Sequence, residues 1–280
     1  MRPQLNGGTL GTPVRPVDAN RERERRGSFD TAADVYARSR PAYPSELVDD
    51  LLRLTGVGSN SRVLEIGPGT GQLSVALAPH IASLLAVELG ANLAGVARRK
   101  LAPFRNSEVV IANFDTWMGT SGNFDAVVAA TSFHWLDPSS RVGKCASLLR
   151  PGGSLAVVDT RWGVAVGEDP FFAASQTCYA RWTPNHDPAW RQVRPEDVPP
   201  PSLGAAHPEF VVVAKQRYVV ARTYTSSEYS DLLSTFSDVL VLQPATRERF
   251  LDSMVGLIDS QFGGRVTRHD LYDLYVTQRI

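Results

Sequence analysis

The sequence predicts an α/β fold in which helices cover a doubly wound, mostly parallel sheet of seven strands. Two observations favour this class. Short apolar segments recur along the chain, and segments with helical periodicity separate most of them. Glycine-rich and proline-rich turns mark the joins between segments. Short apolar strands that alternate with helices are typical of a parallel sheet covered on both faces.

The first half of the chain shows this alternation clearly. An amphipathic helix over 29–36 is stopped by Arg40-Pro41, and a second helix, with Ser45 as its N-cap, ends near Gly56. Strands are then predicted at 62–66, 84–88, 108–112 and 124–130, and helices at 72–78, 92–101 and 139–149.

The second half interrupts the alternation. The turn Pro151-Gly152-Gly153 is a common helix stop, and a fifth strand follows at 154–159. Six prolines within 184–201 preclude a long helix there, whereas the aromatic residues of 161–208 argue against simple disorder. We interpret 161–208 as an inserted cap. The remaining predicted elements are a helix at 171–182, a strand at 210–220, helices at 226–238 and 244–261, and a strand at 274–279.

Composition narrows the classes of function. The 280 residues are 43% hydrophobic and 21% charged, which excludes a disordered chain. The 29 basic and 29 acidic residues balance, which argues against a nucleic-acid or anionic-membrane binder. Neither Cys145 nor Cys178 belongs to a CxxC pair, so we expect no disulfide framework and no metal site. No apolar run reaches the ~20 residues of a membrane span, and the polar N-terminus favours a cytoplasmic protein.

A glycine-rich turn, Gly67-Pro68-Gly69-Thr70-Gly71, lies between the first strand and the next helix. Glycines allow a ligand to approach the backbone closely, and a helix start presents free N–H groups. Glu88 ends the following strand, where a carboxylate can accept both hydroxyls of a ribose. A turn that needs glycines only for its own shape is the alternative. The dinucleotide fingerprint would need glycine at Gln72, and the Gly-Lys-Ser/Thr of a P-loop is absent.

The segment Val63-Leu64-Glu65-Ile66-Gly67-Pro68-Gly69-Thr70-Gly71 resembles the first motif of class I S-adenosylmethionine-dependent methyltransferases. The resemblance continues through Glu88, 124–137 and 149–153. It covers 29–160 well and the C-terminal strands loosely. The segments Tyr36 to Pro44 and His134-Trp135-Leu136-Asp137 look most similar to the branch of trans-aconitate methyltransferase-like small-molecule enzymes.

This resemblance implies a Rossmann-like methyltransferase sheet with an N-terminal helical lid and an inserted cap after strand five. Together with the residue patterns, it predicts a disordered tail over 1–27, a cofactor-binding core with its lid over 28–160, the cap over 161–208, and C-terminal strands and helices over 209–280 that complete the core.

The resemblance also implies which residues bind the cofactor. Glu65 supports the loop, the backbone of the glycine turn meets the methionine part, and Glu88 binds the ribose. Asn113 is favoured over Asp115 for the adenine amino group, with a helix cap or solvated turn as the alternative role of Asp115. The implied contacts are Tyr36, Arg40, Glu65, Gly67, Gly69, Gly71, Glu88, Leu89, Asn113, Phe114, Ala130 and Thr131.

His134 and Trp135 directly follow the end of strand four, so we expect them to face the reaction zone. His134 is the candidate catalytic base, and a structural histidine is the alternative. Trp135, Phe29 and Trp162 are expected to contact the substrate, with packing as the alternative for Trp135. Arg40 is expected to pair with the cofactor carboxylate or an acidic substrate, or to form a surface ion pair.

The resemblance thus predicts an enzyme that moves a methyl group from S-adenosylmethionine to a small-molecule acceptor and releases S-adenosylhomocysteine. O-methylation of a carboxylate or hydroxyl is the expected reaction. The alternatives are methylation at nitrogen or carbon, a non-methylating reaction, or a binding protein without turnover. Neither a nucleic-acid nor a membrane partner is expected, and the sequence does not indicate an oligomeric state.

Overall fold

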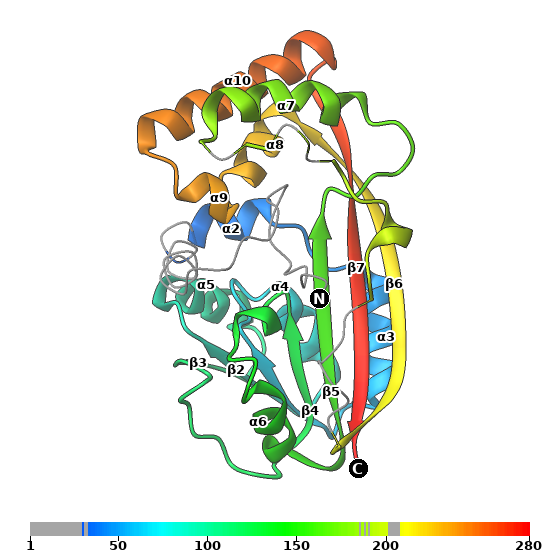
Figure 1. Cartoon of the computed structure of the whole chain (residues 1–280). Coiled ribbons are helices and arrows are strands. Elements are labelled where there is room, and N and C mark those ends of the chain that lie inside the picture. The colour runs from blue at the N-terminus through cyan, green and yellow to red at the C-terminus, as the bar shows by residue number, and fades with distance from the viewer. Residues whose placement is uncertain (1–29, 31–32, 185, 188, 190, 201–207) are drawn as a thin grey trace. The chain divides into compact units, whose positions relative to one another are not determined.

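A computed structural model describes residues 30, 33–184, 186–187, 189, 191–200 and 208–280 (Figure 1). The predicted tail over 1–27 and the predicted site residue Phe29 lie outside these residues. The chain divides into two compact units. Unit 1 takes the described residues of 1–40, 161–199 and 219–271, and unit 2 takes those of 41–160, 200–218 and 272–280.

The seven-stranded sheet has the order β3-β2-β1-β4-β5-β7-β6, which confirms the predicted fold class. Strands β1 to β4 and the adjoining part of β5 pair in parallel. Strand β7 runs opposite to β5 (Figure 1). The strands are β1 (Arg62–Ile66), β2 (Ser83–Glu88), β3 (Ser107–Ile111), β4 (Phe124–Ala130), β5 (Leu149–Trp162), β6 (Phe210–Thr225) and β7 (Arg265–Arg279).

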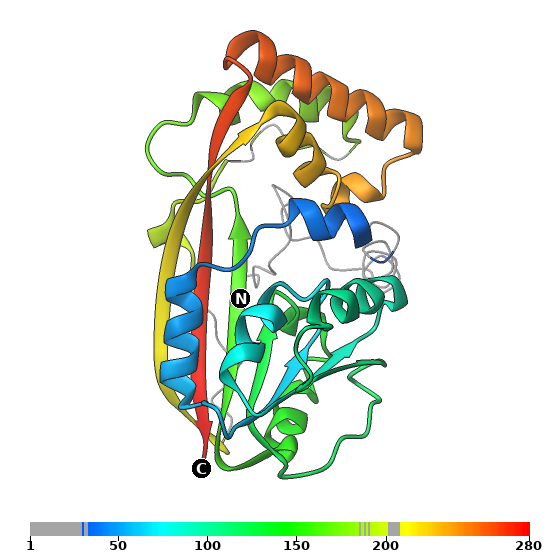
Figure 2. The same cartoon turned by 180° about the vertical axis from the view of Figure 1, so that it is seen from behind.

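The helices of unit 2 connect its parallel strands. Helix α3 ends at Gly56, whose φ of 67° suits a glycine C-cap, as predicted. It lies beside β6 (Figure 2), and the Tyr218 hydroxyl of β6 donates to Asp50 Oδ2 at 2.6 Å. The helices are α3 (Ser45–Thr55), α4 (Gln72–Leu77), η1 (Ala78–His80), α5 (Ala91–Leu101), η2 (Phe133–Trp135) and α6 (Arg141–Leu148).

The start of α3 corrects one prediction. Ser45 is the first helical residue, and Pro44 is the N-cap, without a side-chain cap. The proline ring holds Pro44 at φ −56°, with ψ at 138° outside the helical range. The helix therefore begins one residue earlier than the serine suggested.

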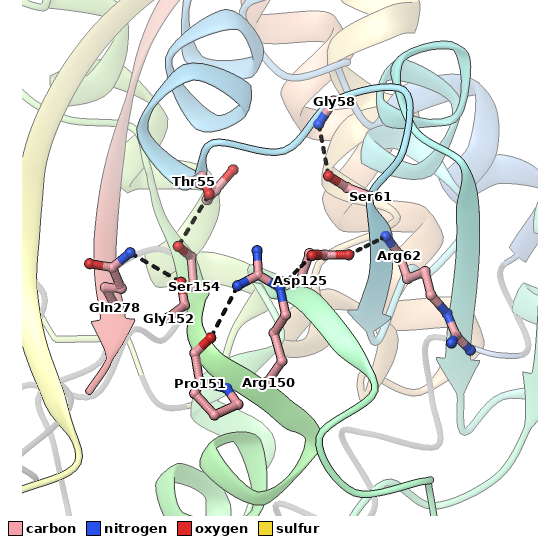
Figure 3. Close-up of polar contacts among 10 residues, drawn as sticks. All are labelled: Thr55, Gly58, Ser61, Arg62, Asp125, Arg150, Pro151, Gly152, Ser154 and Gln278. Atoms are coloured by element: carbon pink, nitrogen blue, oxygen red, sulfur yellow. Dashed lines mark hydrogen bonds and ion pairs between the residues drawn. The ribbon is translucent and has the colours of Figure 1, made fainter.

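Polar contacts hold the strand ends of unit 2 that lie opposite the glycine turn. The Asp125 carboxylate accepts from the Arg62 backbone N–H at 2.7 Å and from Arg150 Nε at 2.6 Å (Figure 3). Ser154 Oγ donates to the Thr55 carbonyl at 3.3 Å. Asp125 thus fixes the beginnings of β1 and β4, while their carboxyl ends remain available for a site.

Helices supply most of the core of unit 1. Helices α7 and α10 run side by side (Figure 1), and fully buried Phe236, Phe250 and Met254 belong to the same apolar cluster. Asp169 caps α7 by accepting from the Phe172 N–H at 2.8 Å. The helices are α2 (Ala33–Ser39), α7 (Pro170–Trp182), η3 (Pro195–Asp197), α8 (Ser226–Leu233), α9 (Ser237–Leu240) and α10 (Pro244–Gln261).

Three strands are longer than predicted. Strand β5 begins at Leu149, so Pro151-Gly152-Gly153 lies within the strand, where its register against β4 shifts. Strand β7 begins at Arg265 because its charged residues are paired rather than solvated; Arg268 Nε donates to Asp270 Oδ1 at 2.8 Å. Strand β6 continues to Thr225, and from Val219 to Tyr224 its exposed positions alternate with half-buried or buried ones.

The units also differ from the domains that the sequence suggested. Residues 219–271, expected to complete the core, group with 161–199 in unit 1. The reason is their apolar face: α8 and α10 share one buried cluster with α7. The predicted helix over 226–238 is divided into α8 and α9.

Two features of the described residues bear on membrane and metal binding. None of their helices combines the length and the apolar character that a bilayer span requires. Within the same residues, no group of three or more His, Cys, Asp and Glu side chains has an arrangement suited to a metal ion.

Candidate functional site

The glycine turn after β1 has a backbone that requires glycine. Gly67, Gly69 and Gly71 have φ values of 63°, 59° and 81°, in the left-handed region that side chains disfavour. A Cβ on Gly67 would lie 2.7 Å from Ser132 Cβ. Ser132 is held there because its hydroxyl donates to the Ile66 carbonyl at 2.5 Å. The turn therefore lies directly against the segment that follows β4.

Glu88 joins this turn to the end of β2. Its Oε2 accepts from the Gly69 N–H and its Oε1 from the Gly90 N–H, each at 2.9 Å. The residue is 6% exposed. A carboxylate offers about four acceptor sites, so these two bonds orient the group without exhausting it. The arrangement fits the predicted ribose-binding role.

Two exposed apolar side chains lie beside Glu88. Leu89 follows it in the chain, and Ile111 is its register partner at the end of β3. Each is 45% exposed, which is unusual for large apolar residues at the end of a buried parallel sheet. They provide apolar surface of the kind on which an adenine ring packs. Ile111 was not among the residues that the sequence indicated.

Asn113 and Asp115, the two candidates for binding the adenine amino group, both accept backbone hydrogen bonds after β3. Asn113 Oδ1 accepts from the Asp115 N–H at 3.1 Å, which forms an Asx turn and directs the backbone. Asp115 Oδ1 accepts from the Asp137 N–H at 3.2 Å, in keeping with the turn role. Phe114 is 4% exposed, its ring lies in the core, and its carbonyl accepts from Lys144 Nζ at 2.5 Å.

Glu65 lies beneath the turn in a fully buried position. Ser74 Oγ donates to its Oε2 at 2.5 Å. Burial raises the pKa of Glu65 to about 7; the Ser74 hydrogen bond opposes this rise and the nearby charge of Glu88 adds to it. Glu65 is thus a carboxyl that titrates near neutrality inside the proposed cofactor site.

Replacing Glu65 by glutamine is expected to change how stability depends on pH. The carboxyl has a raised pKa in the folded chain. Its contribution to stability is therefore present below its ordinary value of 4.5 and is lost as pH rises to about 7. The full loss is about 3 kcal/mol. Urea unfolding between pH 4.5 and 8 should show E65Q gaining that amount relative to the unchanged chain.

A matched control uses Glu108, an exposed residue of β3. E108Q is expected to keep the original pH dependence. If E65Q and the unchanged chain lose stability in parallel across this range, Glu65 does not titrate as the structure indicates.

The hydroxyl groups of Tyr43, Thr131 and Thr160 lie within hydrogen-bond distance of one another in a chain at the end of β4. Thr131 Oγ1 lies 3.0 Å from the Tyr43 hydroxyl and 2.8 Å from Thr160 Oγ1. Among the described residues other than glycine, Thr131 alone has a positive φ, 56°. Such backbone strain costs about 1–3 kcal/mol and concentrates at functional sites. Ala130, directly before it, is 9% exposed at the strand end. Thr131 thus combines strain with a bonded hydroxyl.

His134 and Trp135 occupy the short helix η2 directly after this strand end. Both are half-buried, and their ring centroids lie 4.8 Å apart at 42°. Phe133 between Ser132 and His134 is buried and anchors the segment. The structure therefore brings the predicted base and its aromatic neighbour to the same strand end as Thr131.

The other predicted site residues belong to unit 1. Arg40 is 8% exposed, and it donates through Nε to Thr235 Oγ1 at 2.8 Å and through Nη2 to the Thr235 carbonyl at 3.0 Å. Its guanidinium carbon lies 5.0 Å from the Tyr36 ring centroid and 4.7 Å from that of Trp162. The structure thus brings three predicted residues together, and the Arg40 side chain is buried.

Sequence reasoning missed the residues that support the site from a distance along the chain. Ser132, Tyr43 and Thr160 act through contacts that no local pattern reveals. Tyr43 was part of the segment that carried the family resemblance, which was the one available signal.

Residues 63–153 match the family described as methyltransferase domain. The chain is 33% identical over 131 residues to an uncharacterized methyltransferase of Mycobacterium tuberculosis, covering 47% of this chain and 51% of that protein. It is 38% identical over 100 residues to a ubiquinone biosynthesis O-methyltransferase of Xanthomonas campestris, covering 34% and 41%. The chain therefore spans about half the length, or less, of these relatives.

A solved structure of another protein has a similar fold. A putative type II methyltransferase from Anaeromyxobacter dehalogenans aligns with a TM-score of 0.57 at 19% identity, over 86% of this chain and 97% of that one. This likeness shows the fold. The domain match and the relatives support a class I methyltransferase domain with S-adenosylmethionine as its cofactor.

Proposed function

We propose that the chain transfers a methyl group from S-adenosylmethionine to a small-molecule acceptor, at a carboxylate or hydroxyl oxygen. The observation that carries the proposal is the Glu88 carboxylate, fixed by the Gly69 and Gly90 N–H groups at the end of β2. The O-methyltransferase among the relatives supports oxygen as the accepting atom. The likeness to the trans-aconitate methyltransferase-like branch supports a small acceptor.

The chemistry assigns distinct tasks to the residues of unit 2. When bound, the cofactor supplies an activated methyl group on a sulfonium. The glycine turn and Glu88 hold the ligand, Leu89 and Ile111 offer apolar surface, and orientation of this kind supplies roughly 7–11 kcal/mol. A carboxylate acceptor needs no base. A hydroxyl acceptor would lose its proton to His134.

Calorimetric titration with S-adenosylmethionine tests the proposal, with NAD as the control ligand. Micromolar one-to-one binding of S-adenosylmethionine without binding of NAD is the expected result. Release of S-adenosylhomocysteine in the presence of small carboxylic acids and phenols then tests turnover. Absence of S-adenosylmethionine binding would contradict the proposal, and binding without turnover on any acceptor would favour a binding protein.

The role of His134 makes a separate prediction. His134→Gln is expected to reduce kcat at least about 100-fold on a hydroxyl acceptor, because general base catalysis contributes roughly that much or more. It should leave the Kd for S-adenosylmethionine and turnover on a carboxylate acceptor unchanged. Initial rates on both acceptor types measure the difference. An equal loss on both would assign His134 a structural role.

Tyr36, Arg40, Trp162 and Phe29 keep their proposed roles as binding residues. Arg40 is engaged by Thr235, which supports a positioning role for its guanidinium within unit 1. A nitrogen or carbon acceptor remains the second candidate, and the acceptor screen distinguishes it by the product formed.

A further inference from the structure

The start of β6 combines an open strand edge with exposed valines. Strand β6 is the last in the sheet order, so β7 is its only neighbour among the described strands (Figure 1). Val211, Val212 and Val213 are 48%, 56% and 44% exposed. Successive side chains of a strand point to opposite faces, so apolar surface is exposed on both faces here. We call residues 209–215, which contain these valines, the valine edge.

The backbone of the valine edge points hydrogen-bonding groups away from β7. Strands β6 and β7 run antiparallel (Figure 1), and the Ile280 N–H donates to the Glu209 carbonyl at 2.9 Å. In an antiparallel pair, the peptide groups of successive residues point alternately toward the partner strand and away from it. Val212, three positions after Glu209, therefore directs its N–H and C=O to the open edge, where another strand can pair with them.

The charges of the valine edge make it complementary to a second copy of itself. Glu209 lies three positions before Val212, and Lys215 lies three positions after it. When two copies pair antiparallel about Val212, Glu209 of each copy lies opposite Lys215 of the other, on the same face. Val211 then lies opposite Val213, and the two Val212 residues exchange backbone hydrogen bonds. Parallel pairing in register would place like charges opposite each other instead.

Lys215 is well placed to act as the cation in this pairing. It is exposed, its Nζ lies 5.0 Å from the Tyr275 ring centroid, and it forms no ion pair within the described part of the chain. Arg217, the next residue on that face, is already paired, because its Nε and Nη2 donate to the two carboxylate oxygens of Asp273 at 2.7 Å and 2.8 Å. Glu209 has other interactions within its own chain, and the pairing requires only that its charge be opposite to that of Lys215.

The neighbouring register fits less well. Centred on Val213, the pairing would place the charged Lys215 opposite the apolar Val211 of the other copy. Glu209 would lie opposite Arg217, whose guanidinium is already engaged. The first register instead keeps valine against valine and places each lysine opposite a carboxylate.

We propose that the chain forms a symmetric dimer in which the valine edges of two copies pair antiparallel about Val212. A two-fold dimer is the commonest symmetric assembly, and addition of a strand to an exposed sheet edge is a recurring mode of recognition. A single strand pair buries little surface, so we expect a weak dimer with a dissociation constant in the micromolar range.

Within unit 2, the valine edge lies at the opposite end of the strands from the glycine turn. Gln278, near the end of β7, donates to the Gly152 carbonyl, near the start of β5, at 3.0 Å (Figure 3). The adjoining start of β6 therefore lies at the amino ends of the parallel strands, whereas the glycine turn follows the carboxyl end of β1. The dimer is thus independent of the proposed methyl transfer, and either proposal can fail without the other.

Sedimentation equilibrium of the full chain, from micromolar to submillimolar concentration, tests the proposal. A monomer–dimer equilibrium is expected for the unchanged chain. E209K or K215E places two pairs of like charges in the dimer and should weaken association at least tenfold. E209K/K215E restores opposite charges and should recover the dimer. A chain that stays monomeric, undiminished association in either single variant, or a double variant that associates no better than the single ones would overturn the proposal.

Two further variants cover the case in which charge reversal disturbs β6. V212P removes an N–H that faces the open edge, where proline is tolerated, so it should abolish the dimer and leave the circular dichroism spectrum unchanged. V212C locates the interface. Cys145 and Cys178 are buried, so a short bismaleimide should link two copies through V212C and not through V241C, at an exposed position of unit 1. A dimer that persists in a folded V212P, or equal linking of V212C and V241C, would contradict the proposal.

Discussion

Replacing Glu88 by alanine is expected to reduce the affinity for S-adenosylmethionine at least about 1000-fold. Two losses combine. The carboxylate that would accept the ribose hydroxyls disappears, and hydrogen bonds to a charged group contribute about 1.5–3 kcal/mol each. The N–H groups of Gly69 and Gly90 also lose the acceptor that orients them, so the glycine turn loosens. Calorimetric titration with S-adenosylmethionine measures the change.

A graded series separates these two losses. E88Q retains an acceptor oxygen of similar shape without the charge, and is expected to bind with intermediate affinity. E108A removes an exposed carboxylate of β3 and should bind like the unchanged chain. Unchanged affinity in E88A would show that the ligand lies elsewhere and would contradict the proposed cofactor site.

Replacing Gly67 by alanine is expected to destabilise unit 2 and to abolish S-adenosylmethionine binding. Alanine at a φ of 63° is strained, and its Cβ would lie 2.7 Å from Ser132 Cβ, closer than carbon atoms approach. The strain costs about 1 kcal/mol, and overpacking adds about 1–3 kcal/mol. Urea unfolding measures the stability, and calorimetry measures the binding.

The chain offers a control that isolates the clash from the strain. Gly122 has a φ of 65°, and nothing would lie within 4 Å of its Cβ. G122A is therefore expected to show the backbone cost alone and normal binding. Adding S132G to G67A removes the obstructing Cβ and should restore part of the stability. If G67A and G122A behave alike, close packing against Ser132 has no part in the effect.

The parallel half of the sheet was predictable because its signals are local. The segments around Leu64, Ala86 and Val127 are mostly apolar, as expected for strands that are buried on both faces, and the glycine turn follows the first of them. The residues that β1 to β4 present at their carboxyl ends, Gly67, Glu88 and Thr131 among them, could be located from the same pattern.

The second half of the chain was less predictable because many of its polar residues form hydrogen bonds and ion pairs with residues far away in the sequence. Arg268 and Asp273 are charged residues, yet each is buried in β7 and paired with an opposite charge. The sequence placed Arg40 in the N-terminal lid, whereas the structure shows it hydrogen-bonded to Thr235, 195 positions away. Local periodicity in the sequence does not reveal such pairs. The extent of β7 and the grouping of the helices could therefore be determined only from the structure.

The strand order β5-β7-β6 constrains how the chain can fold as it is synthesised. The segment Tyr272–Ile280 belongs to unit 2 and contains the end of β7, the strand between β5 and β6. This part of the sheet therefore cannot close until β7 has left the ribosome. Until then, the flank of β5 that β7 covers is an open edge able to pair with other chains. Such high contact order slows folding, and it makes the interval before β7 pairs the period in which this open edge is most prone to aggregate.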